Sequence, residues 1–345
     1  MVSPSERLAR ALRPEDTVRI VDLLERTVPP NTRKGRKRAA LYLEAWHQAH
    51  FGEPLRIPSP PETVVAFIIG HYEGLPAAVE RALVEVGIKK PGTHSVATIE
   101  TRLAHWAKAH TSRGFDSPAK NPAVQELRAS LRRDRARQGG QRQARAIDRA
   151  LLDRLVGACL RQVGAEARSA DRLRGLRDAA LFLCAWAPGG RRRSEVAALE
   201  VRDLVEDGDG MVWTLRKSKT DQEGQGLTLW VGARTAAALR EWLEAAGIVD
   251  GAVFRAIDPH GHLGSKALTG RSVSRILKAR ARQAGLDPSK LSPHGFRAGF
   301  MTEGGKRGFS LQELMRLSGH KDAQTALKYH RSGSVRNDRA ASMAE

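Results

Sequence analysis

A basic, glycine-containing stretch divides this chain into two parts and constrains its fold more than any other sequence feature. Residues 132–147 read RRDRARQGGQRQARAI, with a single acidic residue and almost no apolar side chain. Such a composition is typical of a linker. The chain has 345 residues, which suits two domains of ordinary size. We therefore predict a first domain over 1–135, a basic linker over 136–147, a second domain over 148–333 and a C-terminal tail over 334–345.

The first part reads as a succession of short amphipathic helices. The segment SPPETVVAFIIGHYEG opens with a serine and prolines, which is typical of a helix N-terminus. In THSVATIETRLAHWAKAH, apolar residues recur at helical spacing and share one face. They are Val96, Ile99, Leu103 and Trp106, and a segment nearer the N-terminus repeats the pattern with Val18, Val21, Leu24 and Val28. Four or five such helices predict a compact helical bundle.

The second part is predicted to be mostly helical with a small antiparallel sheet. Helices are expected at about 148–162 and 172–186, and several more between 234 and the C-terminus. Between these groups, MVWTLRKSKT and GQGLTLWVG alternate apolar and polar residues around a glycine-rich turn, which predicts a β-hairpin. Two cysteines, Cys159 and Cys184, lie in apolar helical stretches and are expected to be core residues.

The charge balance indicates a polyanionic partner. Lys and Arg total 58 against 38 Asp and Glu, a formal net charge of +20, so we expect the protein to attract nucleic acid. A basic protein whose charge serves only solubility remains the alternative. No signal peptide and no apolar run long enough to span a membrane is seen, so we expect a soluble, cytoplasmic protein without membrane association.

Five short motifs follow one another in the second part. GRRRSE places Arg192 two residues before Ser194, and KSKTDQEG places Lys219 about 27 residues later. HGFR contains His294 and Arg297, and SGH contains His320, which Tyr329 of LKYHR follows after nine residues. Each motif alone is a weak signal, because short matches of this kind are common by chance.

In this order and at these spacings, the motifs resemble the tyrosine recombinase, or phage-integrase, family. The resemblance is strong over about 175–332 and weaker over the N-terminal helices, which look like the family's SAM-like core-binding domain. It implies a DNA breaking-rejoining fold in the second domain and a site-specific recombinase or integrase. The short N-terminus favours a two-domain organisation similar to Cre or Xer recombinases. The role of this protein within the family stays open between phage integration, dimer resolution and transposon mobility. The target DNA sequence also stays open.

The chemistry that the resemblance implies is phosphoryl transfer in which the energy of the phosphate ester bond is kept. A Tyr329 hydroxyl would form a covalent 3′-phosphotyrosine. Arg192 and Arg297 would clamp the charged phosphate, and His320 would donate a further hydrogen bond to it. Lys219 would protonate the leaving 5′-hydroxyl, although Lys217 is a near rival. His294 would act as an acid/base or positioning group, unless it only caps a helix, and Glu195 would orient its neighbours. No metal or other cofactor is expected, since arginines supply the positive charge.

The three consecutive arginines are expected to differ in role. Arg192, Val196 and Leu199 fall at i, i+4 and i+7, so a helix through this stretch would point Arg192 towards the core side. Arg191 and Arg193 would then contact DNA or solvent. Of the other tyrosines, Tyr42 and Tyr72 lie in the N-terminal helices and are expected to be core residues.

The resemblance implies a clamp around double-stranded DNA and a tetramer on paired sites. The helix in THSVATIETRLAHWAKAH is the candidate for the major groove, and other basic residues would mostly position the backbone. The candidates are Arg33, Lys34, Arg36, Lys37, Arg38, Arg132, Arg133, Arg191, Arg193, Lys266, Arg271, Arg275 and Lys278. The tail after Tyr329 is expected to dock on a neighbouring subunit.

Two alternatives remain at this point. One is a type IB topoisomerase or telomere resolvase, which would use the same chemistry. The other is a catalytically inactive or regulatory DNA-binding protein on the same scaffold, against which the complete set of catalytic residue types argues.

Overall fold

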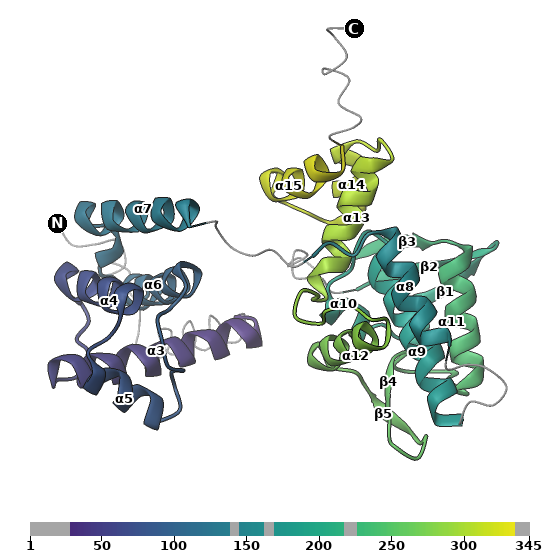
Figure 1. The fold of residues 1–345 in the computed structure, drawn as a ribbon, viewed down its shortest axis with the longest axis horizontal. Coiled ribbons are helices and arrows are strands. Elements are labelled where there is room, and N and C mark those ends of the chain that lie inside the picture. The colour runs from purple at the N-terminus through teal and green to yellow at the C-terminus, as the bar shows by residue number, and fades with distance from the viewer. Residues whose placement is uncertain (1–27, 139–144, 162–168, 217–225, 335–345) are drawn as a thin grey trace, which may run out of the picture. The chain divides into compact units, whose positions relative to one another are not determined.

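The computed structural model describes residues 28–138, 145–161, 169–216 and 226–334, in two compact units. The units comprise Met1–Arg142 and Gln143–Glu345 (Figure 1). Within the described ranges, no helix is both long enough and apolar enough to cross a bilayer. All but the last residue of the helix expected near residues 13–28, and the C-terminal tail from 335 onward, lie outside these ranges.

The N-terminal unit is helical, as predicted. Its described elements are α3 (Pro30–Phe51), α4 (Pro61–Glu73), α5 (Ala77–Glu85), α6 (Val96–Thr111), the short 3-10 helix η1 (Pro118–Lys120) and α7 (Pro122–Arg137). Local capping explains where α6 begins, because the Ser95 side chain accepts a hydrogen bond from the backbone N–H of Thr98 at 3.2 Å. The helix α5 was not indicated by the sequence patterns above.

Aromatic side chains fill the core of this unit. The predicted apolar face of α6 is confirmed, since all four residues are at most 6 % exposed. Trp46 is fully buried and packs edge-to-face against Phe67 and Trp106, with ring centroids 5.0 and 6.2 Å apart. Tyr42 is a core residue, as predicted, and Tyr72 is half-buried with its hydroxyl donating to Asp134. Both hydroxyls therefore bond within the N-terminal unit, Tyr42 to His71 and Tyr72 to Asp134.

The second unit is mostly helical with small antiparallel sheets, which confirms the predicted fold class. Its helices are α8 (Arg149–Leu160), α9 (Ser169–Trp186), α10 (Arg193–Ala197), α11 (Ala233–Ala245), α12 (Gly270–Gln283), α13 (His294–Lys306), α14 (Leu311–Ser318) and α15 (Ala323–Ser334). The strands are β1 (Leu204–Asp207), β2 (Gly210–Leu215), β3 (Leu227–Val231), β4 (Arg255–Ile257) and β5 (Leu263–Ala267), with the short 3-10 helix η2 (Val201–Asp203) before β1.

The predicted hairpin is present, and the sequence patterns missed part of the sheet. Strands β2 and β3 pair antiparallel, with Met211 opposite Val231 and Leu215 opposite Leu227. Strand β1 adds a third member on the other side of β2, and β4 and β5 form a separate hairpin. These missed strands are only three to five residues long, which is too short for a clear alternation of apolar and polar residues.

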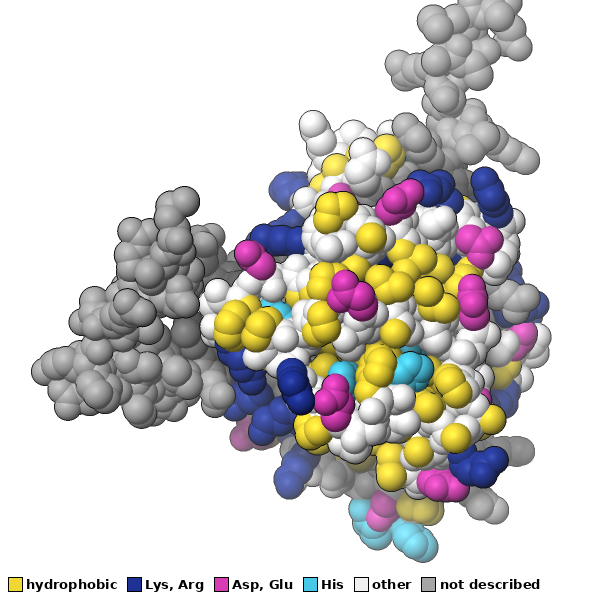
Figure 2. Space-filling view, turned by 90° about the vertical axis from the view of Figure 1, so that its left-hand side faces the viewer, with side chains coloured by type: hydrophobic (Ala, Val, Ile, Leu, Met, Phe, Trp, Pro, Cys, Tyr) yellow, Lys and Arg dark blue, Asp and Glu magenta, His cyan; other side chains and the backbone are white. Residues whose placement is uncertain are grey.

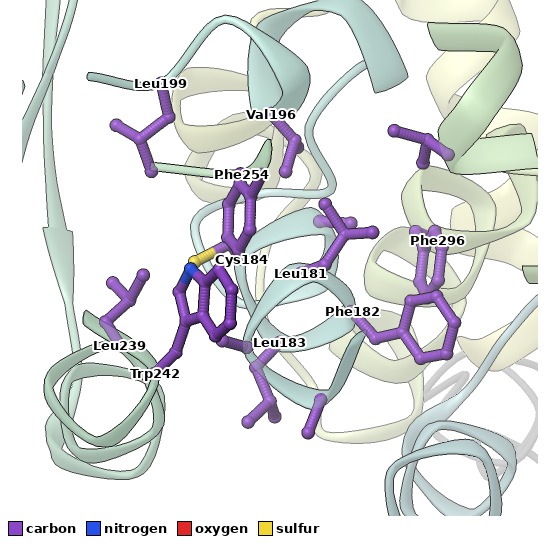
Figure 3. Close-up of a cluster of buried hydrophobic side chains, with 14 of the residues drawn as sticks. Leu181, Phe182, Leu183, Cys184, Val196, Leu199, Leu239, Trp242, Phe254 and Phe296 are labelled. Carbon is purple, nitrogen blue, oxygen red and sulfur yellow. The ribbon is translucent and has the colours of Figure 1, made fainter. Parts of the chain in front are cut away.

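Helix α9 runs through the middle of the second core. Its residues Leu181–Cys184 are almost completely buried, with Trp242 of α11 on one side and Phe296 of α13 on the other (Figure 3). The Phe182 and Phe296 rings lie 5.5 Å apart, which ties α13 to α9. Cys159 and Cys184 are fully buried free thiols, as predicted. The last residue of α9, Trp186, leads directly into the arginine-rich loop.

The described residues at the two ends of the predicted linker belong to the units that they adjoin. Helix α7 continues to Arg137, inside the range 136–147 that was predicted as a linker. At the other end, Ile147 is fully buried in the second unit, and its N–H donates to the Gly295 carbonyl at 2.8 Å. A Cβ on Gly299 would lie 1.7 Å from the Ile147 carbonyl oxygen, so this chain crossing requires glycine in α13. Residues from 145 onward therefore help to hold the start of α13.

Candidate active site

Two glycines bring the arginine-rich loop against two other elements. Gly189 and Gly190 have φ angles of +88° and +69°, a region that glycine adopts without strain. A Cβ on Gly190 would lie 2.4 Å from the Cα of Arg297, and one on Gly189 would lie 2.4 Å from the Leu317 carbonyl oxygen. The loop therefore passes directly between α13 and the end of α14, which no bulkier residues would allow.

Arg192 leaves this loop held by Glu195. It is the N-cap of α10, with extended φ and ψ of −67° and 144°. Glu195 is 4 % exposed, and its carboxylate accepts from the Arg192 guanidinium at 2.7 Å and from the Arg192 backbone N–H at 3.1 Å. The prediction that Arg192 and Leu199 lie on one face of the same helix is wrong, because α10 spans only Arg193–Ala197. The carboxylate, rather than helical phase, fixes the direction of Arg192.

The neighbouring arginines differ more than expected. Arg193 is exposed and donates to the Ser274 hydroxyl of α12 at 2.9 Å. The prediction that Arg191 is exposed to DNA or solvent is wrong, since it is only 2 % exposed. Its guanidinium donates to the carbonyl oxygens of Leu317 and Gly189. A local helical reading could not reveal this, because the partner lies 126 residues further along the chain.

Arg297 and His320 are joined in a directed chain of hydrogen bonds. Arg297 is 4 % exposed; its Nη1 donates to the Gly190 carbonyl at 3.2 Å, and its Nε donates to His320 Nε2 at 3.0 Å. Because His320 Nε2 accepts, its neutral ring carries the proton on Nδ1, which lies 2.7 Å from Ser318 Oγ. The Ser318 hydroxyl in turn can donate to the Met315 carbonyl at 3.4 Å.

Residues 318–320 owe this arrangement to the end of α14. Gly319 adopts the left-handed conformation (φ 66°, ψ 37°) that commonly ends a helix, and its N–H bonds to the Met315 carbonyl. The turn directs His320 back towards α13. Ser318, which is 1 % exposed, was not among the predicted site residues. Its place beside Gly-His was the only available signal, and a serine near a helix end is usually read as part of the turn.

Tyr329 faces His294 across two packed helices. Its hydroxyl lies 3.3 Å from His294 Nε2, and the two rings meet edge-to-face with centroids 6.0 Å apart. The Thr302 hydroxyl of α13 donates to the Tyr329 carbonyl at 3.3 Å and fixes α15 along α13. His294 does not cap its helix, because the N-cap is Pro293 and no side chain caps it. The tyrosine and the histidine thus come together within one chain.

The site holds positive charge on arginines and neutral histidines. Burial lowers the pKa of His320 to about 4, with Arg297 the next largest cause. The pKa of His294 is lowered by burial and then by Arg297 and Arg192. Burial also lowers the pKa of Arg297 and of Arg191 to about 10, which leaves both protonated at neutral pH. An arrangement of this kind attracts an anion and can donate several hydrogen bonds to it.

Lys219 lies outside the described residues, so its place relative to this cluster stays a prediction. The strands that flank it, β2 and β3, are described and form the expected hairpin. The structure therefore brings together Arg192, Glu195, His294, Arg297, His320 and Tyr329.

The predicted DNA contacts fall on several surfaces. On α12, Arg271, Arg275 and Lys278 are exposed at i, i+4 and i+7 and so share one face. In the N-terminal unit, a groove of about 710 Å³ between α3 and α6 has a strongly basic lining. Its basic residues are Arg36, Lys37, His105, Lys108 and Arg113.

The remaining basic candidates are all exposed as well. They are Arg33, Lys34, Arg38, Arg132, Arg133 and Lys266, of which Arg132 also bonds to Glu100 at 3.3 Å. Basic residues do not cover the molecule evenly. On the face that Figure 2 turns to the viewer, hydrophobic side chains gather in the middle, and Lys and Arg lie mainly around the edge.

Comparison with known proteins gives consistent results. The chain is 27 % identical over 326 residues to a Selenomonas ruminantium protein described as an integrase/recombinase xerD homolog, covering 92 % of this chain and 86 % of that protein. Its fold is similar to XerH site-specific recombinase bound to difH DNA (14 % identity, TM-score 0.57, covering 89 % of this chain and 79 % of that one). It is also similar to the Tn1549 transposon integrase in complex with transposon-end DNA (15 %, 0.57, covering 91 % and 95 %). A family model described as the phage integrase family matches residues 161–334, about half of the sequence, and the chain therefore belongs to this family of tyrosine recombinases.

Proposed function

We propose that this chain cleaves and rejoins DNA at specific sites through a covalent bond between Tyr329 and a 3′-phosphate. The observation that carries the proposal is the meeting of Tyr329 with His294 beside the Arg297–His320 pair in one chain. Cleavage forms a bond from Tyr329 Oη to phosphorus and breaks the bond from phosphorus to the 5′-oxygen. Rejoining reverses both steps, so the bond energy is retained.

Each residue of the site has a role in this exchange. Arg192, held by Glu195, and Arg297 bind the non-bridging oxygens, whose charge grows in the transition state. His294, neutral at pH 7 because its pKa is lowered, takes the proton of Tyr329. Lys219 returns a proton to the leaving 5′-oxygen.

His320 serves first by orienting Arg297. Its Nε2 accepts from Arg297 in this structure, so the predicted donation to phosphate requires the other tautomer or an added proton.

The test is a nicked DNA that traps the covalent intermediate. The substrate carries the target site, found by sequencing DNA that flanks the gene. On a denaturing gel, the wild type gives a protein–DNA adduct and Tyr329→Phe gives none. Tyr72→Phe, in the other unit, is the matched control and keeps the adduct. DNA binding without any adduct would instead identify an inactive binder, and relaxation of supercoiled DNA lacking the site would identify a topoisomerase.

We infer that both units contact double-stranded DNA in the cytoplasm. In the N-terminal unit, the exposed side of α6 carries small residues and one lysine: Ala97, Thr101, Ala104 and Lys108. A helix face of this kind can approach base edges closely in the major groove. The basic groove beside it and the exposed face of α12 supply contacts to phosphates.

We propose that four copies assemble on paired sites and that the C-terminal tail of one copy docks on another. An apolar pocket of about 320 Å³ supports this. It is lined by Trp186, Phe300, Phe309, Leu314 and Leu317, and Phe309 is 50 % exposed. The tail after Ser334 contains apolar residues of its own, including Val335 and Met343, that suit such a pocket. Exposed apolar pockets with polar rims mark interaction sites.

Two variants test this assembly. Deletion from residue 334 onward and Phe309→Ser are each expected to weaken pairing of two DNA sites while leaving binding to one site unchanged. Native gels with one-site and two-site DNA separate the two events. Unimpaired pairing by both variants would contradict the proposed docking.

A further inference from the structure

Arg191 differs in its bonding partners from the buried cations that lie away from the candidate active site. Lys89 pairs with Glu80, and both Arg177 and Arg280 pair with Asp178. In the part of the chain that the structure describes, Arg191 bonds only to neutral carbonyl oxygens, and its Nε has no partner. The nearby carboxylate of Glu195 is bonded to Arg192 instead.

A buried charge without a carboxylate is unfavourable for folding. Removing one partner of a buried ion pair is strongly destabilising, but Arg191 has no carboxylate bonded to it among the described residues, so its replacement by an apolar side chain of similar size leaves no opposite charge unpaired. Filling the space at position 191 therefore does not require an arginine. Burial lowers the pKa of Arg191, the nearby Glu195 carboxylate offsets part of this, and Arg192 lowers the pKa further. A phosphate at this place would offset the excess positive charge.

The contact of Arg191 also fixes the geometry of the site. Its guanidinium bonds to the Leu317 carbonyl at the end of α14, directly before Ser318 and two residues before Gly319. On the other side, its own chain follows Gly190, whose carbonyl accepts from Arg297. Arg191 thus ties the end of α14 to the loop on which Arg297 rests.

We propose that Arg191 is a positioning residue for phosphoryl transfer: its buried guanidinium holds the end of α14 so that His320 meets Arg297, and adds positive charge to the phosphate site. The proposal rests on the proposed function of this site. It assigns no direct contact between Arg191 and the reacting atoms.

The charges that face His320 come from two elements besides its own. Arg297 and His294 face it from α13, and Arg191 and Arg192 face it from the loop before α10. Removing the charge of Arg191 makes His320 easier to protonate, so its pKa rises. A side chain that only fills space would leave this pKa unchanged when replaced by another of similar size.

The first test compares three variants on the nicked substrate at pH 7. Arg191→Met is expected to slow adduct formation by about 30-fold to 100-fold, since small displacements of catalytic groups cost that much. Arg191→Lys keeps the charge and recovers part of the rate. Arg280→Met removes another buried arginine of the same unit and keeps the wild-type rate. DNA affinity stays within about 2-fold for Arg191→Met, because a buried group releases no counterions from the backbone.

The second test needs no DNA. NMR titration of the His320 ring, assigned with His320→Gln, is expected to give a higher pKa in Arg191→Met and an unchanged one in Arg280→Met. Arg191→Met is also expected to melt within about 2 °C of the wild type or above it, whereas Arg280→Met melts below it.

The two tests separate the failure of this proposal from the failure of the proposed function. With an active wild type, an unchanged adduct rate or an unchanged His320 pKa in Arg191→Met overturns the positioning role. A wild type that forms no adduct removes the proposed function, and the titration alone then decides on Arg191.

Discussion

The two units bury basic side chains in different ways. In the N-terminal unit, His71 and His110 are buried and bond to backbone carbonyls one turn earlier in their helices, and the one buried cation among the described residues, Lys89, pairs with Glu80. Among the described residues of the second unit, the buried basic groups are all arginines: Arg177, Arg191, Arg280 and Arg297. A neutral histidine can serve as an ordinary core residue, whereas a charged arginine needs a counter-charge.

This contrast separates structure from chemistry within one basic protein. Arg177 and Arg280 have found their carboxylate in Asp178 and stabilise the second core. Arg191 and Arg297 bond to neutral groups instead and lie beside the candidate catalytic residues. The net charge of the chain does not distinguish these cases, but burial and partners do.

The largest expected effect separates two adjacent arginines. Arg192→Ala removes a guanidinium that is fixed by Glu195, and adduct formation should fall by about 10³-fold. Arg193→Ala removes an exposed group, and should weaken DNA binding and lower its salt slope by about 1 without changing the cleavage chemistry. Rates and affinities on the nicked substrate at several salt concentrations measure both. Equal losses of rate in the two variants would contradict the assignment.

The next effect concerns the glycine that lets the loop approach α13. Gly190→Ala places a Cβ 2.4 Å from the Arg297 Cα at a φ of +69°, so the free energy of unfolding should fall by roughly 3 kcal/mol. Gly208→Ala is the matched control, with φ +59° and nothing within 4 Å of the added Cβ, and should cost only about 1 kcal/mol. Urea denaturation gives both values. A similar cost at both positions would show that the close approach is not needed.

A smaller effect is expected at the serine that bonds His320. Ser318→Ala removes the acceptor of the Nδ1 proton, so the ring no longer favours the tautomer that accepts from Arg297. Adduct formation should slow by about 10-fold, the scale of one lost hydrogen bond. Ser289→Ala, which removes an exposed hydroxyl bonded to Asp287 in the same unit, is the control and should keep the wild-type rate. An unaltered rate for Ser318→Ala would show that the tautomer does not matter.

Acidification should affect the neutral histidines of the N-terminal unit. Burial lowers the pKa of His71 to about 3 and that of His94 to about 4, from 6.5. Below about pH 6.5 the unfolded chain binds protons that the folded unit does not, so the stability of this unit falls as pH falls towards 4. Hydrogen exchange of peptides from 28–138 at pH 7 and pH 5, corrected for intrinsic rates, measures this change.

The variant His94→Gln and bound DNA test the cause of this acid sensitivity further. His94→Gln should reduce the acid sensitivity of the N-terminal unit, because it removes one of the histidines whose pKa is lowered there. His294 and His320 add acid sensitivity to the second unit, and bound DNA should diminish it by placing negative charge beside them. If DNA changed the acid response of both units equally, the contrast between core and site histidines would not hold.

Local patterns predicted much of the fold and most of the site. Periodicity identified the buried face of α6, and alternation identified the β2–β3 hairpin. The order and spacing of short motifs identified Arg192, Glu195, His294, Arg297, His320 and Tyr329, which the structure brings together. The short strands β1, β4 and β5 and the helix α5 were missed because they carry little periodic signal.

The predictions failed where the outcome depended on distant residues. The three arginines follow one another in sequence, yet one is buried, one is held by Glu195 and one is exposed. Helical phase could not sort them, because α10 begins only at Arg193. Ser318 likewise belongs to the site only because it bonds to His320, which in turn accepts from Arg297.

The helical class, the division into two units and the residue types available for phosphoryl transfer could all be predicted, because they follow from local periodicity, composition and spacing. Which arginine is buried, and which ring nitrogen of His320 carries the proton, became visible only in the folded chain. Both outcomes depend on backbone carbonyl oxygens: Arg191 donates to that of Leu317, and Ser318, which bonds His320, donates to that of Met315. Every residue carries such an oxygen. A backbone partner leaves no mark in the sequence, so its position becomes visible only when the chain is folded.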